Sequence, residues 1–432
     1  MFGTCLTLSL TSCSDDEDLN DEPKNEQKEN QQDQKKDFEV STLTAEQIQE
    51  MTAGYNQFAW NFLSEVGSKQ SGENYFLSPL SMGIDWAMLE NGANGNTLTQ
   101  IKNAIGFEGY SNEEVNGYFY ALIKSLNSAD SVDFDLANAL FFNETKGFTF
   151  DSTFSSFLTN TYDAYVKGGD FSETFRAEIN KWCSDKTKGK IENAVPKLDP
   201  EKGLFALINS IYLKSKWAKS FEEGKLLPGE FTTDMKSSVS VDYMEDIRNL
   251  KYAENDNLQY AEVSLAKGDY SVFFALPKEG KSLTETAQYL SSNWSSLLSS
   301  DSALVYIGIP KFKVNYELGG DNMIGVLKSL GMNDVFNSAF ADLWGCFNVY
   351  KGKGTPYVSN VIQKTTFELT EKGAEAYAVT VIIVEEELIA PAPVEEPELK
   401  IMFMNRPFIY GIKDNKTGVV MFNGCMNDPS AE

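Results

Sequence analysis

The segment from Glu371 to Val384 constrains the fold of this chain more than any other part of the sequence. It opens with Glu371-Lys372-Gly373 and continues with small and β-branched residues up to the apolar run Val381–Val384. An acidic, proline-containing stretch then follows as far as Pro397. Such a segment can be an extended loop in one state and a buried strand in another, so the chain needs a sheet that accepts a further strand.

Alternation within this segment tests that interpretation, because successive side chains of a strand point to opposite faces. If Ala374 faces the core, the other inward residues are also small or apolar: Ala376, Ala378, Thr380, Ile382 and Val384. Glu375 and Tyr377 then point outward, and a slip by one residue would bury the charge at a cost of several kcal/mol. No proline lies between Gly373 and Ala390, and Gly373 supplies backbone freedom. The alternative is an ordinary strand with alanine-rich packing.

Composition excludes several classes of function. The formal net charge of −26 argues against nucleic acid or an anionic membrane surface as a binding partner. The sequence contains no histidine, which removes histidine-based triads, general bases and metal ligands. The five cysteines have no close paired spacing, and no motif nominates a Ser/Lys or carboxylate pair. We therefore predict no catalytic residue, no metal site and no cofactor.

The N-terminus is similar to the end of a bacterial lipoprotein signal peptide. Residues 2–10 are apolar or small, and Leu10-Thr11-Ser12-Cys13 matches the tetrapeptide that precedes lipid attachment, although a basic n-region is missing. This resemblance implies that residues 1–13 are a signal remnant with lipid on Cys13, in an outer-membrane lipoprotein of the cell surface or periplasmic face. The alternative is the frayed start of a domain. Without Cys5, the folded part keeps Cys183, Cys346 and Cys425, which we expect to be buried thiols.

Residues 14–40 are dominated by Asp, Glu, Asn, Gln and Lys, and cannot bury enough apolar surface to offset chain entropy. They are predicted to be a disordered acidic tether. The cluster Asp15-Asp16-Glu17-Asp18 resembles surface-export signals of lipoproteins, with a solvated linker as the alternative.

The body of the chain, residues 41–429, shows no repeat and no dividing linker, which predicts a single α+β domain. Hydrophobic periodicity predicts helices over residues 43–66, 79–91, 97–105, 112–126, 151–165, 173–187, 283–299 and 322–330. Strands are predicted over residues 74–78, 133–142, 204–213, 239–244, 249–253, 258–264, 270–276, 304–315, 357–369, 399–404, 407–412 and 418–425.

Several motifs, in order, resemble the serpin family over about residues 45–429. They are Asn74-Tyr-Phe-Leu-Ser-Pro-Leu-Ser81, Gly92-Ala-Asn-Gly-Asn-Thr97, Thr187-Lys-Gly-Lys-Ile191, Leu207-Ile-Asn-Ser-Ile-Tyr-Leu-Lys-Ser-Lys-Trp217, Ile309-Pro-Lys-Phe312 and Asn405-Arg-Pro-Phe-Ile-Tyr-Gly-Ile-Lys-Asp-Asn-Lys-Thr-Gly418. The resemblance implies a large central β-sheet A with two smaller sheets, about eight or nine helices and an exposed reactive-centre loop over about residues 371–398.

The resemblance implies the mechanism of the family members that inhibit proteases. In these, a protease cleaves the loop, becomes acylated by it, and is carried along when the loop inserts into sheet A. The implied hinge residues are Glu371, Lys372, Gly373, Ala374, Glu375, Ala376, Tyr377 and Ala378. Ser78 and Asn209 match a polar cluster beneath the opening strands, and Trp217 matches a tryptophan where insertion starts. Gln363 stands where many family members have histidine, and its amide can donate and accept without titrating.

The family's usual spacing from Glu371 places the reactive bond at Glu387–Leu388. The loop is several residues longer than in typical animal members, so the bond is expected within a window from Val384 to Ala390. Acidic residues there suit a protease that accepts glutamate, whereas Leu388, Ile389 or Ala390 suits an elastase-like or chymotrypsin-like enzyme. Glutamates at 385, 386, 387, 395, 396 and 398 would attract a basic protease, with a solvated loop as the alternative.

These expectations combine into a lipid-anchored, monomeric, non-enzymatic suicide inhibitor of serine proteases, and of papain-like cysteine proteases. Its partners are the target protease in a covalent complex and the membrane through the N-terminal lipid. The alternatives are a non-inhibitory binding or decoy lipoprotein of the same fold, and a surface lipoprotein that binds small molecules or glycans.

Overall fold

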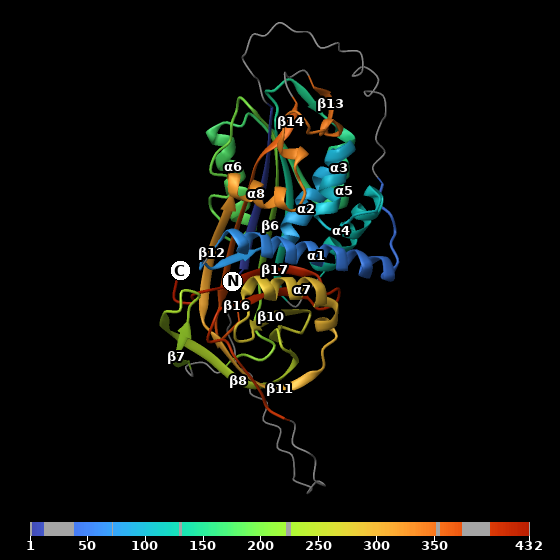
Figure 1. Ribbon diagram of the computed structural model, residues 1–432. Helices are drawn as coiled ribbons and strands as arrows, with labels where there is room; N and C mark the ends of the chain where they lie inside the picture. The colour runs from blue at the N-terminus through green and yellow to red at the C-terminus, as the bar shows by residue number, and fades with distance from the viewer. Residues whose placement is uncertain are drawn as a thin grey trace.

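The structure, a computed structural model, describes residues 2–12, 39–70, 72–128, 132–221, 226–350, 355–373 and 398–431. One six-stranded sheet and one nine-stranded sheet, with a two-stranded ribbon, are accompanied by eight α-helices in this part of the chain. In Figure 1 the six-stranded sheet extends through the upper part of the molecule, and the nine-stranded sheet forms the lower part. The expected α+β class, with sheets and helices, is confirmed.

The helices follow the predicted order closely, and six of these eight begin after a residue whose side chain caps the first turn. They are α1 (Ala45–Lys69), α2 (Pro79–Glu90), α3 (Gly95–Ala104), α4 (Asn112–Asn127), α5 (Ser152–Tyr162), α6 (Glu173–Lys186), α7 (Leu283–Leu298) and α8 (Gly320–Ser329). Thr44, Ser111 and Ser282 each form a capping box with the residue three positions later. All eight predicted helices are present, with ends that differ by a few residues.

The six-stranded sheet, called sheet A below, has the order β12-β14-β1-β6-β3-β5. Its strands are β12 (Phe312–Gly319), β14 (Pro356–Leu369), β1 (Phe2–Ser12), β6 (Gly203–Lys214), β3 (Asp133–Asn143) and β5 (Ala164–Gly169). β1 is antiparallel to both of its neighbours, so β6 and β14 run parallel to each other on either side of it. The position between β6 and β14 is called the central slot.

The nine-stranded sheet has the order β15-β11-β8-β9-β10-β16-β17-β2, and β7 pairs with β8 beside this path. Its strands are β15 (Lys400–Phe403), β11 (Ser302–Pro310), β8 (Ser238–Glu254), β9 (Leu258–Leu265), β10 (Tyr270–Pro277), β16 (Phe408–Asp414), β17 (Val420–Met426), β2 (Tyr75–Leu77) and β7 (Leu227–Thr232). The ribbon pairs β4 (Phe148–Phe150) with β13 (Phe347–Tyr350).

Two strand predictions need correction. The expected strands over residues 239–244 and 249–253 are one strand, β8, which pairs with β11 along most of its length and with β9 at its end. The expected strand over residues 304–315 is two strands, because Lys311 separates β11 from β12, which belong to different sheets.

β1 is the most consequential strand that the sequence analysis did not predict. Its residues were assigned to a signal remnant, and the structure places them at the centre of sheet A. The proposed lipidation at Cys13 and residues 14–38 of the predicted tether lie outside the described residues. No helix in the described ranges is long and apolar enough to cross a membrane.

An aromatic core lies where α1 and α7 pack beside the nine-stranded sheet. The Phe273 ring on β10 lies 5.6 Å from the Trp60 ring and 5.1 Å from the Trp294 ring, between centroids. Phe76 on β2 stacks on Tyr410 and Phe422, and its ring also meets Phe367 of β14 at 4.6 Å. The two sheets therefore share one continuous apolar core.

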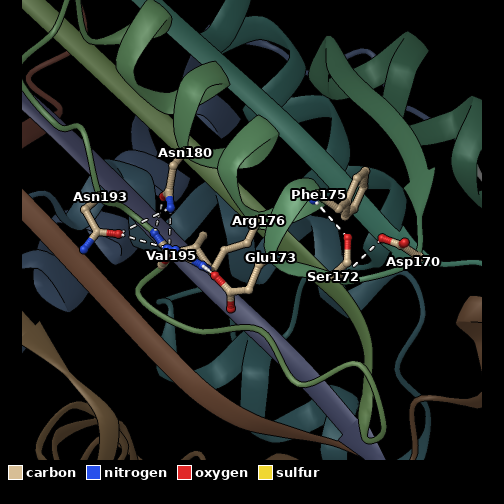
Figure 2. A network of polar contacts seen from close by, with 8 residues as sticks. All are labelled: Asp170, Ser172, Glu173, Phe175, Arg176, Asn180, Asn193 and Val195. Atoms are coloured by element: carbon tan, nitrogen blue, oxygen red, sulfur yellow. Dashed lines mark hydrogen bonds and ion pairs between the residues drawn. The ribbon is translucent and has the colours of Figure 1, made fainter.

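A second, smaller core covers part of sheet A on its other face. There α6 and residues 191–198 pack on apolar side chains of β3 and β6. Figure 2 shows the polar contacts that fix this cover. Asn180 accepts the Val195 N–H at 2.7 Å and donates to the Val195 carbonyl at 2.9 Å, while Arg176 donates to the same carbonyl at 3.1 Å. The segment after α6 is thereby held against the helix that it follows.

Candidate functional site

The predicted hinge begins as a tight turn at the end of β14. The Gly373 N–H donates to the Thr370 carbonyl at 3.1 Å, and the Thr370 hydroxyl donates to the Gly373 carbonyl. Gly373 has a φ of 88°, and a Cβ there would lie 2.4 Å from the Trp217 backbone nitrogen. A side chain would be both strained and blocked, so this position requires glycine.

The turn is fixed against the chain that follows β6. The Trp217 indole donates to the Thr370 carbonyl at 2.8 Å, and the Phe221 N–H donates to the Glu371 carbonyl at 3.0 Å. Lys216 forms an isolated antiparallel bridge with Gly373. The structure therefore brings the predicted Trp217 and the predicted hinge together at one end of the central slot.

Glu371 contributes an ion pair to the same turn. Its carboxylate lies 3.3 Å from the Lys311 ammonium, and its side chain is 17% exposed. Burial by itself raises the pKa of Glu371, but a backbone hydrogen bond and the Lys311 charge outweigh burial and leave the pKa below its ordinary value. The turn thus favours the ionised carboxylate.

A buried arginine, which the sequence analysis missed, supports Phe221 beside the turn. The Arg248 guanidinium lies 3.7 Å from the centroid of the Phe221 ring and pairs with Asp246 at 2.9 Å. Lys219 also pairs with Asp246, at 2.9 Å. No sequence motif marks this cluster, because it forms only when β8 meets the segment after β6.

The predicted polar cluster is present in part. Ser78 caps α2, its N–H donates to Gln363 Oε1 at 3.0 Å, and Gln363 Nε2 donates back to the Ser78 carbonyl at 2.8 Å. The expectation that a glutamine amide both donates and accepts here is met by this geometry. Both side chains are buried.

Asn209 belongs to a separate contact. Its Nδ2 donates to Asn138 Oδ1 at 2.5 Å, whereas its Oδ1 has no hydrogen-bond partner within the described ranges. Leu6 of β1 is the register partner of both Asn209 and Gln363. β1 therefore separates two polar residues that were expected to form one cluster.

Asp85 is a buried acid near this cluster that the sequence analysis also missed. It is fully buried on α2, and neither carboxylate oxygen makes a hydrogen bond of good geometry to a described residue. Burial raises the pKa of Asp85 well above its ordinary value, and an interaction with the Asn209 backbone only partly opposes this. The available signal was one acid in the otherwise uncharged run Pro79–Leu89.

The remaining predicted site residues are not all described. Lys372 lies in the turn, partly buried. Ala374, Glu375, Ala376, Tyr377 and Ala378 lie outside the described residues, as do Glu387 and Leu388 of the predicted reactive bond.

Cys183, Cys346 and Cys425 are buried thiols, as expected, and burial raises the pKa of Cys425 to about 12. Among the described residues, no group of three or more Cys, Asp or Glu side chains is placed to hold a metal ion.

Comparison with protein families gives one match that covers most of the chain. The profile described as "Serpin (serine protease inhibitor)" matches residues 53–429. Human Serpin B7 is 29% identical, and the alignment covers 88% of this chain and 99% of the relative. The leukocyte elastase inhibitor of Xenopus laevis is 28% identical, with 88% of this chain and 100% of the relative covered.

Solved structures agree with the sequence matches. A thermophilic serpin, tengpin, in its native state has a TM-score of 0.77 and 29% identity, with 92% of this chain and 98% of that chain covered. The same protein in its latent state has a TM-score of 0.70 and 25% identity, covering 90% and 99%.

Proposed function

Because the chain belongs to the serpin family, we propose that it is an inhibitor of serine proteases that works by reactive-loop cleavage and insertion into sheet A. The segment after Gly373 is the bait, and the acylated protease is carried with it when it inserts. The same trap suits papain-like cysteine proteases, which also form an acyl intermediate. The chain acts as an inhibitor rather than as an enzyme.

The observation that carries this proposal is the antiparallel bridge between Thr370 and Gly373. If that pairing continues, the segment folds back along β14 into the central slot, with one loop residue opposite each β14 residue. The resulting inward pairs are Ala374 with Leu369, Ala376 with Phe367, Ala378 with Thr365, Thr380 with Gln363, and Ile382 with Val361.

The burial of β14 supports this register. All five β14 residues of those pairs are buried, whereas Glu368 and Thr366, which would lie opposite Glu375 and Tyr377, are partly exposed. Cross-strand partners share a face of the sheet. The small residues of the loop would therefore enter on the buried face, and its charged and aromatic residues would stay outside.

For the reactive bond we propose Glu387–Leu388 within the window Val384–Ala390. The target is an elastase-like, chymotrypsin-like or glutamate-accepting protease, and the acidic loop favours a basic one. A relative that is named for inhibition of leukocyte elastase supports the first of these classes.

We also propose that the protein is a monomer with lipid on Cys13, held at the bacterial outer membrane on the surface or periplasmic face. The motif Leu10-Thr11-Ser12-Cys13 supports this anchor. Metabolic labelling with a fatty acid, on the parent and on Cys13→Ser, tests it. Label on the parent alone is expected, and equal labelling of the two would contradict the anchor.

A protease panel tests inhibition. The chain is incubated with neutrophil and pancreatic elastases, chymotrypsin, a glutamyl endopeptidase and subtilisin, and an SDS-resistant complex with at least one of them is expected. The panel is repeated on Leu6→Pro, because proline interrupts β1 and opens the slot. Cleavage without any complex, by every protease on both chains, would reject inhibition in favour of a non-inhibitory protein of the same fold.

A hinge variant and a matched control sharpen the same test. Gly373→Val should lose the complex and be cleaved as a substrate, because the valine side chain would be strained at this φ and would meet the Trp217 backbone. Glu108→Val, at an exposed position away from the turn, should keep complex formation. Equal complex formation by both variants would show that the turn at Gly373 is not required for inhibition.

The alternative, a non-inhibitory binding or decoy protein, is favoured by one observation. The central slot already contains β1 along the length of that strand. A sheet that is already filled cannot take the loop unless β1 leaves.

A further inference from the structure

The central slot of sheet A has two candidate occupants within this one chain. We propose that Phe2–Ser12 is an internal plug that blocks insertion of the segment after Gly373 until the plug is withdrawn. This inference rests on the proposed function, because it concerns the same slot. It adds that the chain regulates its own trap through its N-terminus.

The plug is paired along both edges. Phe2 lies opposite Leu213 of β6 and Phe367 of β14, and the pairing continues to Ser12, which lies opposite Pro356. Both ladders are antiparallel, with one register shift in each near Leu10. An extended segment bonded on both sides completes the hydrogen bonding of β6 and β14, which would otherwise have open edges.

The direction of the plug is that of an inserted loop. β6 and β14 both end near the hinge, and Phe2 lies at that end. A segment that folds back from Gly373 also has to start there and run antiparallel to β14. In the register set by the Thr370–Gly373 bridge, Ala376, Thr380 and Ile382 would take the places opposite β14 that Phe2, Leu6 and Leu8 hold now. Insertion and the plug therefore exclude each other.

The sequence of the plug suits a central strand. Leu6, Leu8 and Leu10 alternate with Thr7, Ser9 and Thr11, and the stretch contains neither charge nor proline. Leu8, whose side chain is described, is 1% exposed within the main core. This alternation of leucine with threonine or serine is the sequence signal for the strand β1. A signal peptide is also a short, largely apolar stretch, so the signal-peptide interpretation hid the strand.

The polar residues beside the plug suit its withdrawal. Asn209 and Gln363 flank Leu6, and Asn209 Oδ1 is buried without a partner within the described ranges. If β1 leaves and β6 approaches β14, these two amides come within reach of each other, and Asn209 gains the donor that it lacks. A buried acceptor without a donor is costly, which favours closure behind the departing strand.

The sequence suggests how the plug is released. β1 ends at Ser12, directly before the Cys13 at which the lipoprotein motif predicts processing. Hydrolysis of the Ser12–Cys13 peptide bond consumes one water molecule and separates the whole plug from the rest of the chain. Maturation would then convert a blocked form into one that can take the loop.

A cross-link tests where the plug lies. Cys5 is the register partner of Lys364, so Lys364→Cys in the full chain puts two cysteines at paired positions of the β1–β14 ladder. Mild oxidation should then join the introduced thiol to Cys5, which peptide mapping by mass spectrometry identifies. The double variant Lys364→Cys/Cys5→Ser is the matched control. Absence of a Cys5 link under conditions that oxidise an exposed thiol pair would overturn the occupancy of the slot.

Complex formation then tests the block. Oxidised Lys364→Cys should form no SDS-resistant protease complex, whereas the oxidised double variant, in which β1 is not tied, should form it. Leu6→Pro should form more complex than the parent, and Gln27→Pro, a proline outside β1, should match the parent. Complex formation by the cross-linked chain would overturn the block.

The two proposals fail in different ways. A Cys5 cross-link without any complex from any variant supports the plug and rejects inhibition. Complex formation without a Cys5 cross-link supports inhibition and rejects the plug.

Discussion

The two large sheets of this molecule are stabilised in different ways. In the nine-stranded sheet, β8, β9 and β10 follow one another along the chain and pair antiparallel, and β16 and β17 do the same. In sheet A, the central strand comes from the opposite end of the chain from β14 and separates two strands that are parallel to each other. Part of the first sheet is therefore joined by short connections between consecutive strands, whereas no short connection ties the central strand of sheet A to either of its neighbours.

This difference shows where a conformational change can occur. Withdrawal of β10 from the nine-stranded sheet would break its antiparallel pairing with β9 and remove Phe273 from the aromatic core. Withdrawal of β1 leaves all other strand connections intact. We therefore expect stability to be concentrated in the nine-stranded sheet and exchange to be confined to the central slot.

The largest effect is expected in the nine-stranded sheet. Phe273→Ala removes a fully buried ring that contacts Trp60 and Trp294, and should lower the free energy of unfolding by about 3–5 kcal/mol. Urea unfolding measures this, with Phe340→Ala, an exposed phenylalanine, as the control. A similar small loss in both variants would contradict the idea that this core carries the stability.

Asp85→Asn should stabilise the fold at neutral pH. The pKa of Asp85 in the folded state lies above its ordinary value of 3.8 because the group is buried. Its contribution to stability is therefore complete below pH 3.8 and is lost as the pH rises through the folded-state pKa. Asparagine does not titrate, so the variant should gain on the order of 1–3 kcal/mol over the parent at pH 8, and little at pH 4.

Melting curves at several pH values measure this difference, and Asp256→Asn, at an exposed position, is the control. A gain that does not change with pH would mean that titration of Asp85 is not its cause.

The matched pair Leu8→Ala and Leu207→Ala compares an exchangeable strand with a fixed one. The two leucines lie opposite each other in β1 and β6, and both are buried. Leu207→Ala should cost about 2–5 kcal/mol, as for an ordinary core leucine. Leu8→Ala should lower the free energy of unfolding by less. Once the loss equals the free energy of withdrawing β1, the strand leaves the sheet and the rest of the fold is not destabilised further. Equal losses in urea unfolding would show that β1 is as fixed as β6.

The smallest effect is expected at the hinge. Glu371→Gln removes the ion pair with Lys311, which is partly exposed, so the loss at neutral pH should be below about 1 kcal/mol. Because the pKa of Glu371 is lowered in the fold, this contribution is present above the ordinary value of 4.5 and is lost as the pH falls through the folded-state pKa. Melting at pH 7 and pH 3 measures this, and Glu108→Gln, at an exposed position, is the control.

Much of the fold was predictable because its signals are local. Caps at Thr44, Ser111 and Ser282 mark helix starts, and Ser78-Pro79 marks the passage from β2 to α2. The alternation after Gly373 stays a prediction, because the residues that carry it lie outside the described residues.

The remaining features depend on contacts between distant segments. The raised pKa of Asp85 and the position of Arg248 against Phe221 both require the assembled fold. The split between β11 and β12 at Lys311 depends on which sheet each half joins, and periodicity does not show this. The place of β1 depends on the facing edges of β6 and β14. These strands are far from β1 in the sequence, so a local sequence pattern cannot predict the pairing.

Backbone amide hydrogen exchange before and after cleavage of the reactive loop tests the central claim, that sheet A exchanges one strand for another. The parent and Leu6→Pro, both as full chains, are cleaved within the window Val384–Ala390, and exchange is followed separately for residues 2–12 and 374–384. The account predicts that residues 2–12 stay protected and residues 374–384 exchange freely in the cleaved parent, whereas residues 374–384 become protected in cleaved Leu6→Pro, in which residues 2–12 exchange freely. Free exchange of residues 374–384 in cleaved Leu6→Pro, or protection of both segments together in one cleaved chain, would contradict it.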